Sequence, residues 1–143
     1  MNAAEALRAL DRQKYLNLET YRKSGKGVRT PVWFAAAPGG APRLYVYTTA
    51  DSGKVKRIRN SGASKIAPCD AWGKVTGPWI DARAEIVTSD EFARGMALIN
   101  RKYRPLKQIL DLSALLFNRP ERAMIAIRPV WGSAAAPSAR PGR

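Results

Sequence analysis

The sequence predicts an α+β domain, mainly β, in which about six antiparallel strands close into a barrel with short helices between and after them. Six segments alternate apolar and polar residues or are rich in strand-forming residues. Glycine- and proline-containing turns join most of them, which favours hairpins over parallel crossovers. The length of 143 residues with 45% hydrophobic residues fits one domain that buries a real core.

The first elements are a helix, a hairpin and an interrupted strand. Ala and Leu at helical spacing predict a short helix over 2–12. The alternating segment that begins at residue 15 and reaches the glycines at 25 and 27 predicts a strand running into a hairpin. The next strand, over 28–37, contains Pro31, which cannot donate to a ladder. We therefore expect a bulge or a free edge there, where a ligand can meet unpaired backbone.

A clean strand and a short helix follow the turn at 38–42. The segment 43–49 alternates as a half-buried strand does. The segment 51–62 has two apolar residues three apart among cations, which predicts a short helix with a narrow apolar stripe. Asp51 or Ser52 caps its start.

The rest of the chain continues with strands and adds helices late. The predicted segments are a strand over 63–70, a loop over 70–77, a strand over 78–87, a helix over 91–103 capped by Ser89, a second helix over 105–117 and a closing strand over 122–132. The sequence has no internal repeat and no linker long enough to separate domains. We expect one barrel domain over 1–131 and a flexible basic tail over 132–143.

The absence of histidine restricts the chemistry. It removes the usual general base, the usual zinc ligand and every Ser-His-Asp arrangement. With Cys69 as the single cysteine, a protein-built transition-metal site and an internal disulfide are not expected. An enzyme of this composition needs a bound organic cofactor. The single thiol and the charged N-terminus, which is neither a signal peptide nor a membrane anchor, predict a cytoplasmic protein.

The net charge of +14 draws in polyanions, including nucleic acid, membrane surfaces and multiply charged small molecules. One dense basic run covers 54–59 and a second covers 101–107. A nucleic-acid site needs aromatic residues among its cations, and the first run contains none. We therefore expect no nucleic-acid partner.

Three runs resemble one known family: VRTPVWF, LYVYTTADSGKVKRIRNSG and KIAPCDAWGKVTG. They are similar to the pyridoxamine-phosphate-oxidase-like (PPOX-class) split barrels, and most of all to the branch that depends on the deazaflavin coenzyme F-420. The resemblance spans about residues 15–130. It implies a six-stranded antiparallel split β-barrel with short flanking helices, and a homodimer with the cofactor at the subunit interface. The implied activity is hydride transfer between F-420 and an organic acceptor, with an FMN-binding reductase or oxidase as the alternative.

The resemblance also implies the cofactor contacts. In the family one strand lays its backbone against the ring, the next ends in residues that touch the cofactor, a serine–spacer–basic run holds the phosphate, and a later polar residue completes the ring contacts. The matching positions are Arg29, Thr30, Pro31, Val32 and Trp33; Tyr47 and Thr48; Ser52, Gly53 and Lys54; and Thr76. Unlike the oxidases that make pyridoxal phosphate, the chain has no histidine and a short C-terminus. The polyglutamate tail of F-420 suits its positive charge.

The residues of the phosphate run support this independently. A helix start offers free amides and partial positive charge. Gly53 lets the backbone approach closely, the Ser52 hydroxyl adds a donor, and a charge-assisted bond from Lys54 contributes about 1.5–3 kcal/mol. The ordinary alternative is a capped, solvated helix face. At most one or two of Lys56, Arg57 and Arg59 join the site, because helix positions two apart face different ways.

The remaining aromatic and thiol positions have ordinary alternatives too. Trp33 fits either a ring pocket or the core, since tryptophan is mostly buried. Cys69 fits a small buried sulfur better than a reactive thiol. Trp72 and Trp79 fit a substrate opening, a dimer contact or plain barrel packing.

Overall fold

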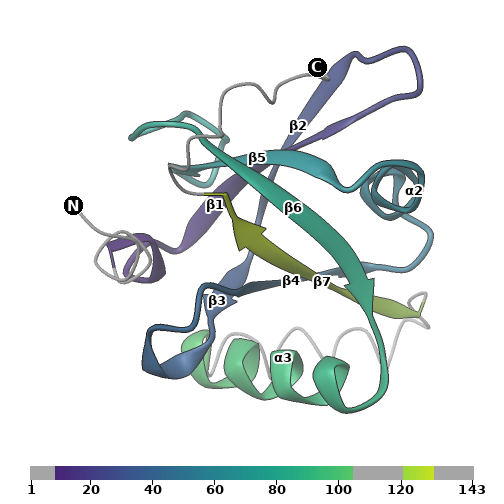
Figure 1. Ribbon diagram of the computed structural model, residues 1–143. Helices are drawn as coiled ribbons and strands as arrows, with labels where there is room; N and C mark the ends of the chain where they lie inside the picture. Colours follow the sequence, from purple (N-terminus) through teal and green to yellow (C-terminus); the bar gives the residue numbers. More distant parts are fainter. Residues whose placement is uncertain (1–8, 105–120, 131–143) are drawn as a thin grey trace.

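A computed structural model describes residues 9–104 and 121–130 of the chain. The elements, in chain order, are β1 Tyr15–Tyr21, β2 Gly27–Val32, β3 Phe34–Ala36, the 3-10 turn η1 Pro38–Gly40, β4 Leu44–Thr49, α2 Gly53–Asn60, β5 Ala63–Cys69, β6 Ile80–Val87, α3 Ser89–Lys102 and β7 Arg122–Pro129 (Figure 1). The mainly β, antiparallel prediction is confirmed, because every strand pair is antiparallel.

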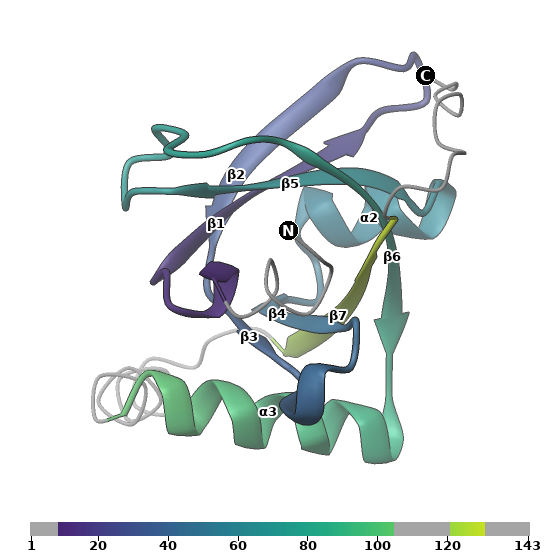
Figure 2. The same cartoon turned by 60° about the vertical axis from the view of Figure 1, so that its left-hand side comes forward.

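The strands form one curled sheet in the order β2-β1-β5-β6-β7-β4-β3. β2 and β3 follow each other directly in the chain but stand at opposite ends of this order, so the sheet must bend round on itself (Figure 2). The backbone N–H of Tyr47 in β4 donates to the carbonyl of Trp33, between β2 and β3, at 3.4 Å. This bond joins the two ends of the sheet. We call the line along which β2 and β4 meet without strand pairing the split.

The described residues form seven strands, and the predicted count of six is wrong. The strand expected over 28–37 divides at Trp33, where the chain stops pairing with β1 and begins pairing with β4. The interruption therefore falls two residues after Pro31. Pro31 itself lies opposite Asn17 in β2, which pairs only with β1 among the described strands. The predicted free edge at the proline is thus present.

Apolar side chains fill the barrel and a second layer lies outside it. The largest fully buried side chains inside are those of Leu16, Leu18, Phe34, Leu44, Val46, Ile66, Ile125 and Ile127. On the outer face of β4 and β7, Tyr45 and Met124 pack against α3. Helix α3 runs along one side of the barrel, and α2 lies beside β5 and β6 (Figure 2).

The helix predictions are confirmed for α2 and corrected for α3. Ser52 is the N-cap of α2, its Oγ accepts from the backbone N–H of Val55, and the apolar stripe is buried. Helix α3 was expected to be capped by Ser89, which is wrong. Thr88 has the extended backbone of a cap, whereas Ser89 is the first helical residue with φ 55°, in the left-handed region that an extended cap cannot occupy.

Parts of the sequence-based prediction lie outside the described residues. They are most of the first helix, the second helix over 105–117 and the tail over 132–143. The described end of the first helix, residues 9–11, is helical and buries Leu10. Within the described ranges no helix has the length and apolarity needed to cross a membrane.

Candidate cofactor site

The corner between the end of β4 and the start of α2 collects hydroxyl groups and cations. The Thr48 Oγ1 lies 3.5 Å from the Ser52 Oγ, within hydrogen-bond reach. Both hydroxyls therefore stand at the first turn of a helix whose free amides attract anions. The structure thus brings Thr48, Ser52, Gly53 and Lys54 to one place, because they follow one another through a tight turn.

Arg57 also belongs to this corner, although the sequence reasoning did not single it out. Its Nε donates to the Thr20 Oγ1 at 2.7 Å. A Cβ built on Gly53 would lie 2.7 Å from its Nη1, so the guanidinium covers the start of α2. Positions four apart share a helix face. The spacing of Gly53 and Arg57 was the signal that could have found this residue.

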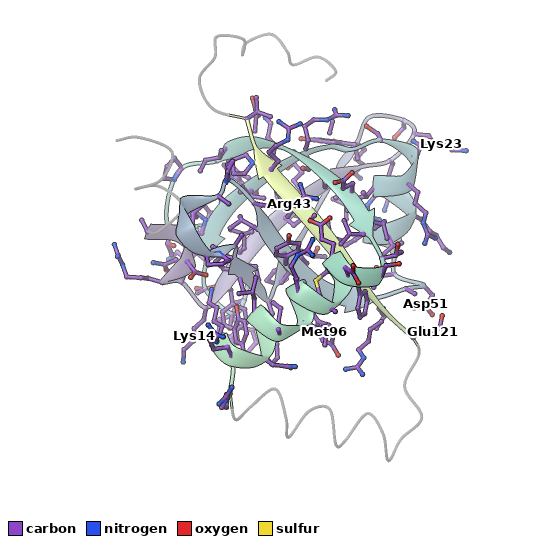
Figure 3. All side chains as sticks on the ribbon, turned by 60° about the horizontal axis from the view of Figure 1, so that its bottom comes forward. Lys14, Lys23, Arg43, Asp51, Met96 and Glu121 are labelled. Atoms are coloured by element: carbon purple, nitrogen blue, oxygen red, sulfur yellow. The ribbon has the colours of Figure 1, made fainter. Side chains whose placement is uncertain are left out.

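The corner holds positive charge without a facing carboxylate. Burial and then the charge of Arg57 lower the pKa of Lys54. Burial and then the charge of Arg22 lower the pKa of Arg57. Asp51 and Glu121 lie near each other at this edge of the molecule, but neither forms an ion pair with a described residue (Figure 3). A bound anion would relieve this repulsion, so the corner fits a phosphate group.

The expected contacts on β2 face in two directions. Thr30 lies opposite Leu18, on the inner side, and its Oγ1 is buried without a hydrogen-bond partner among the described residues. Arg29 lies on the outer side, where its Nε bonds the Glu19 Oε1 at 2.6 Å and its guanidinium lies 4.4 Å from the Trp79 ring centroid. The side chain of Arg29 is thus occupied elsewhere. Only its backbone remains for the expected ring contact.

Trp33 and Tyr47 both pack against the cluster of Ile99 and Tyr103 at the C-terminal end of α3. The Trp33 ring stacks on Tyr103 with centroids 4.6 Å apart and planes 5° apart. The Tyr47 OH accepts from the Arg122 Nη1 at 3.0 Å. Val32, next to Trp33, is buried in the barrel core. These contacts fix the wall of the split between β2 and β4.

Thr76 lies in the loop between β5 and β6, away from the α2 corner. Its side chain is exposed and its N–H donates to the carbonyl of Pro68 at 2.8 Å. A Cβ built on Gly73 in this loop would lie 3.8 Å from Pro31, which places the loop near the far end of β2. The α2 corner meets β1 at Thr20, which lies opposite Val28 of β2. From Val28 to Pro31 the strand advances roughly 10 Å, so the corner and the Thr76 loop lie at different points along β2.

Several other residues have structural roles. Burial raises the pKa of the Cys69 thiol, and the charge of Asp70 adds to this, so the thiol is not activated. Lys102 bonds the Asp11 Oδ1 at 3.3 Å and lies 3.6 Å from the Phe34 ring centroid. It is therefore a packing residue within the second basic run. No group of three or more potential metal ligands occurs in the described part of the chain.

Comparison with known proteins places the fold. Neither protein-family models nor curated sequences gave a match. Solved structures did match. A heme storage protein from Vibrio cholerae has a TM-score of 0.66 and 14% identity, over 92% of this chain and 93% of that chain. An F-420 reductase has a TM-score of 0.57 and 20% identity, over 92% of this chain and 96% of that chain. A protein related to a general stress protein of the pyridoxinephosphate oxidase family, from Clostridium acetobutylicum, has a TM-score of 0.61 and 15% identity, over 89% of this chain and 82% of that chain. The fold is that of the PPOX-like split barrels. Neighbours of one fold thus carry different printed functions, and the F-420 branch is one of several.

The PPOX-like barrel here offers one corner for an anion and, at the split, the unpaired edge of β2. The corner supplies hydroxyls, helix amides and two partly buried cations. The split supplies the unpaired Thr30 Oγ1 and the Trp33–Tyr47 wall. The residues present therefore fit a phosphorylated flavin-type molecule.

Proposed function

We propose that the protein is an oxidoreductase that binds coenzyme F-420 and transfers a hydride between it and an organic acceptor. The observation that carries this proposal is the α2 corner, where Lys54 and Arg57 are partly buried beside Thr48 and Ser52 without a facing carboxylate. Partly buried cations that form no ion pair favour an anionic ligand. A helix start is a ready binding site for a phosphate group.

The chain's residues position the cofactor in this proposal. Ser52, Lys54 and Arg57 hold the phosphate at one end of β2. The β2 backbone, Trp33 and Tyr47 then flank the ring, about three residues along β2 from the phosphate. Thr76 completes the ring contacts. When bound, the reduced deazaflavin supplies the hydride. The stacked Trp33 fixes the wall and excludes water from one side, which helps hold the donor at a fixed distance from its acceptor.

The proposal includes a cytoplasmic homodimer with each cofactor at the subunit interface. The free edge of β2 and the tryptophan at the tip of the β5–β6 loop support it. Trp72 is 91% exposed, which is unusual for so large an apolar side chain. A second copy packed against these features would cover both.

FMN is the alternative cofactor, because the same corner accepts its phosphate. The high positive charge of the chain favours F-420, whose polyglutamate tail adds negative charge. Nucleic acid is not proposed, because the cations of α2 do not share one surface. Lys54 lies at its start and the Arg57 guanidinium reaches back to Gly53, whereas Lys56 and Arg59 are exposed elsewhere on the helix.

The test titrates F-420 and FMN separately into cofactor-free protein and compares Lys54→Gln with Lys56→Gln. Both changes remove one positive charge from α2, but Lys56 is exposed outside the corner. We expect Lys54→Gln to weaken the preferred cofactor about tenfold, the low end for a charge-assisted bond at a partly exposed group. We expect Lys56→Gln to change it by less than about twofold. Equal losses, or no binding of either cofactor by the wild-type protein, would refute the site.

A further inference from the structure

A second cationic surface lies at the other end of α2. A groove of about 630 Å³ opens between the last turn of α2 and the outer faces of β6 and β7. Four arginines line it: Arg43, Arg59, Arg83 and Arg128. Figure 3 shows Arg43 against β7, above α3. An α-helix of eight residues spans about 12 Å, so this groove is distinct from the cofactor corner at the start of α2.

Two of these arginines stand directly opposite each other. Arg83 of β6 pairs in register with Arg128 of β7. Both side chains are exposed on the outer face. Like charges at directly opposed strand positions destabilise a sheet. The register therefore brings two arginine side chains to opposed positions on one face of the sheet, where one anion can meet both.

The nearby carboxylates do not neutralise this pair. Glu85 bonds the Arg43 Nη2 at 2.8 Å, and Glu91 bonds the Arg43 Nε. The hydrogen bond with Glu91 is the main reason why the pKa of Arg43 is raised. Arg43 therefore takes up both carboxylates. Arg59, Arg83 and Arg128 form no ion pair with any residue that the structure describes.

Small residues line the groove and leave room for the Arg83 side chain. Ala84 and Ala126, both buried, contribute to its lining. A Cβ on Gly62 would lie 2.8 Å from the Ala84 carbonyl and 3.3 Å from the Arg83 Nη2. Glycine at 62 thus lets the Arg83 guanidinium lie against the backbone. The volume falls within the range of small-molecule sites.

We propose that this groove binds a small molecule that carries two or more linked phosphate groups. Opposed strand residues have Cα atoms about 5 Å apart, so their guanidinium forks can meet adjacent oxyanion groups. Planar, always-charged arginine forks suit phosphate oxygens in pairs, and the groove contains no lysine. Arg59 reaches the same ligand from α2. The groove and the cofactor corner are independent sites.

The test is calorimetric titration with sodium triphosphate at about physiological salt, where diffuse surface charge is screened beyond about 8 Å. Arg83→Ser/Arg128→Ser is compared with Arg12→Ser/Arg101→Ser, which removes the same charge from exposed arginines outside the groove. We expect at least a tenfold loss in the groove variant and less than twofold in the control. Without ligand, the groove variant should also melt at a higher temperature than the control, because repulsion is relieved.

Further arms separate the alternatives. Wild-type protein should bind citrate at least tenfold more weakly than triphosphate, and Lys54→Gln should retain triphosphate binding. FMN affinity should be unchanged in the groove variant, which distinguishes this site from the cofactor corner. Arg128→Lys keeps the charge without the fork and should lose part of the affinity. Equal losses in the two double variants, unchanged binding in the groove variant, or equal binding of citrate would overturn the proposal.

Discussion

Gly53→Ala tests how Arg57 reaches the cofactor corner. The added Cβ would lie 2.7 Å from the Arg57 Nη1 and 3.4 Å from its Cζ, distances at which the guanidinium must move. The side chain is long and flexible, so the helix itself need not shift. The substitution therefore moves a charge away from the start of α2 without removing it from the protein.

The expected magnitudes for folding and binding differ. Alanine in a helix is favoured over glycine by about 0.5–1 kcal/mol. Loss of the Arg57–Thr20 hydrogen bond costs a similar amount, about 0.5–1.5 kcal/mol. Stability should then change by less than about 1 kcal/mol. Loss of a charge-assisted bond to phosphate costs about 1.5–3 kcal/mol, which weakens cofactor binding by about 10- to 150-fold.

The assay follows cofactor fluorescence during titration and unfolding by urea in parallel. Arg57→Gln should weaken binding to the same degree, and combining it with Gly53→Ala should add little, because both changes remove one contact. Retention of full affinity in Gly53→Ala would refute the role of Arg57. Additive losses in the double variant would show that the methyl group blocks the ligand directly.

Two further predictions concern the frame of the site. Tyr103→Phe should lower the free energy of unfolding, measured by urea denaturation, by about 1–3 kcal/mol. The reason is that the Tyr103 OH accepts from the buried Phe34 N–H at 3.0 Å, and no other group replaces this acceptor. An unchanged free energy of unfolding would contradict the prediction. The hydrogen bond from Arg43 is the main reason why the pKa of Glu91 is lowered in the folded protein. The contribution of ionised Glu91 to folding stability is therefore fully present above its unfolded pKa of about 4.3, and it is lost as the pH falls through the folded pKa. Urea unfolding at several pH values from about 7 to 3 should therefore show a smaller loss of stability in Glu91→Gln than in wild type, and parallel profiles would contradict it.

The sequence predicted most strands because their signal is local. Segments such as β4 and β6 alternate apolar and polar residues, and this pattern follows directly from one buried and one outer face. The cap and stripe of α2 were equally local. The division of β2 from β3 was not, because Trp33 continues a strand-like run. Only the pairing partners on either side, β1 and β4, reveal that the chain changes neighbours there.

The site was predictable where residues adjoin in sequence and less so elsewhere. Thr48, Ser52 and Lys54 follow one turn, and the structure places them together. The direction of Arg29 depends on Glu19 and Trp79, which lie far from each other in the chain. The Arg83–Arg128 pair depends on the register between β6 and β7 across an intervening helix. No local pattern encodes that register.

The change of partner at Trp33 also explains why the barrel wall stays unpaired between β2 and β4. A continuous strand would have paired with β1 and β4 in turn along its whole length and closed the wall. Instead β2 stays an edge strand, and among the described residues the backbone bond from Tyr47 to Trp33 joins the two sides. The Trp33–Tyr103 stack then ties this junction to the end of α3. Packing outside the barrel therefore holds this junction, and in the proposed function Tyr103 positions the Trp33 wall rather than contacting the cofactor.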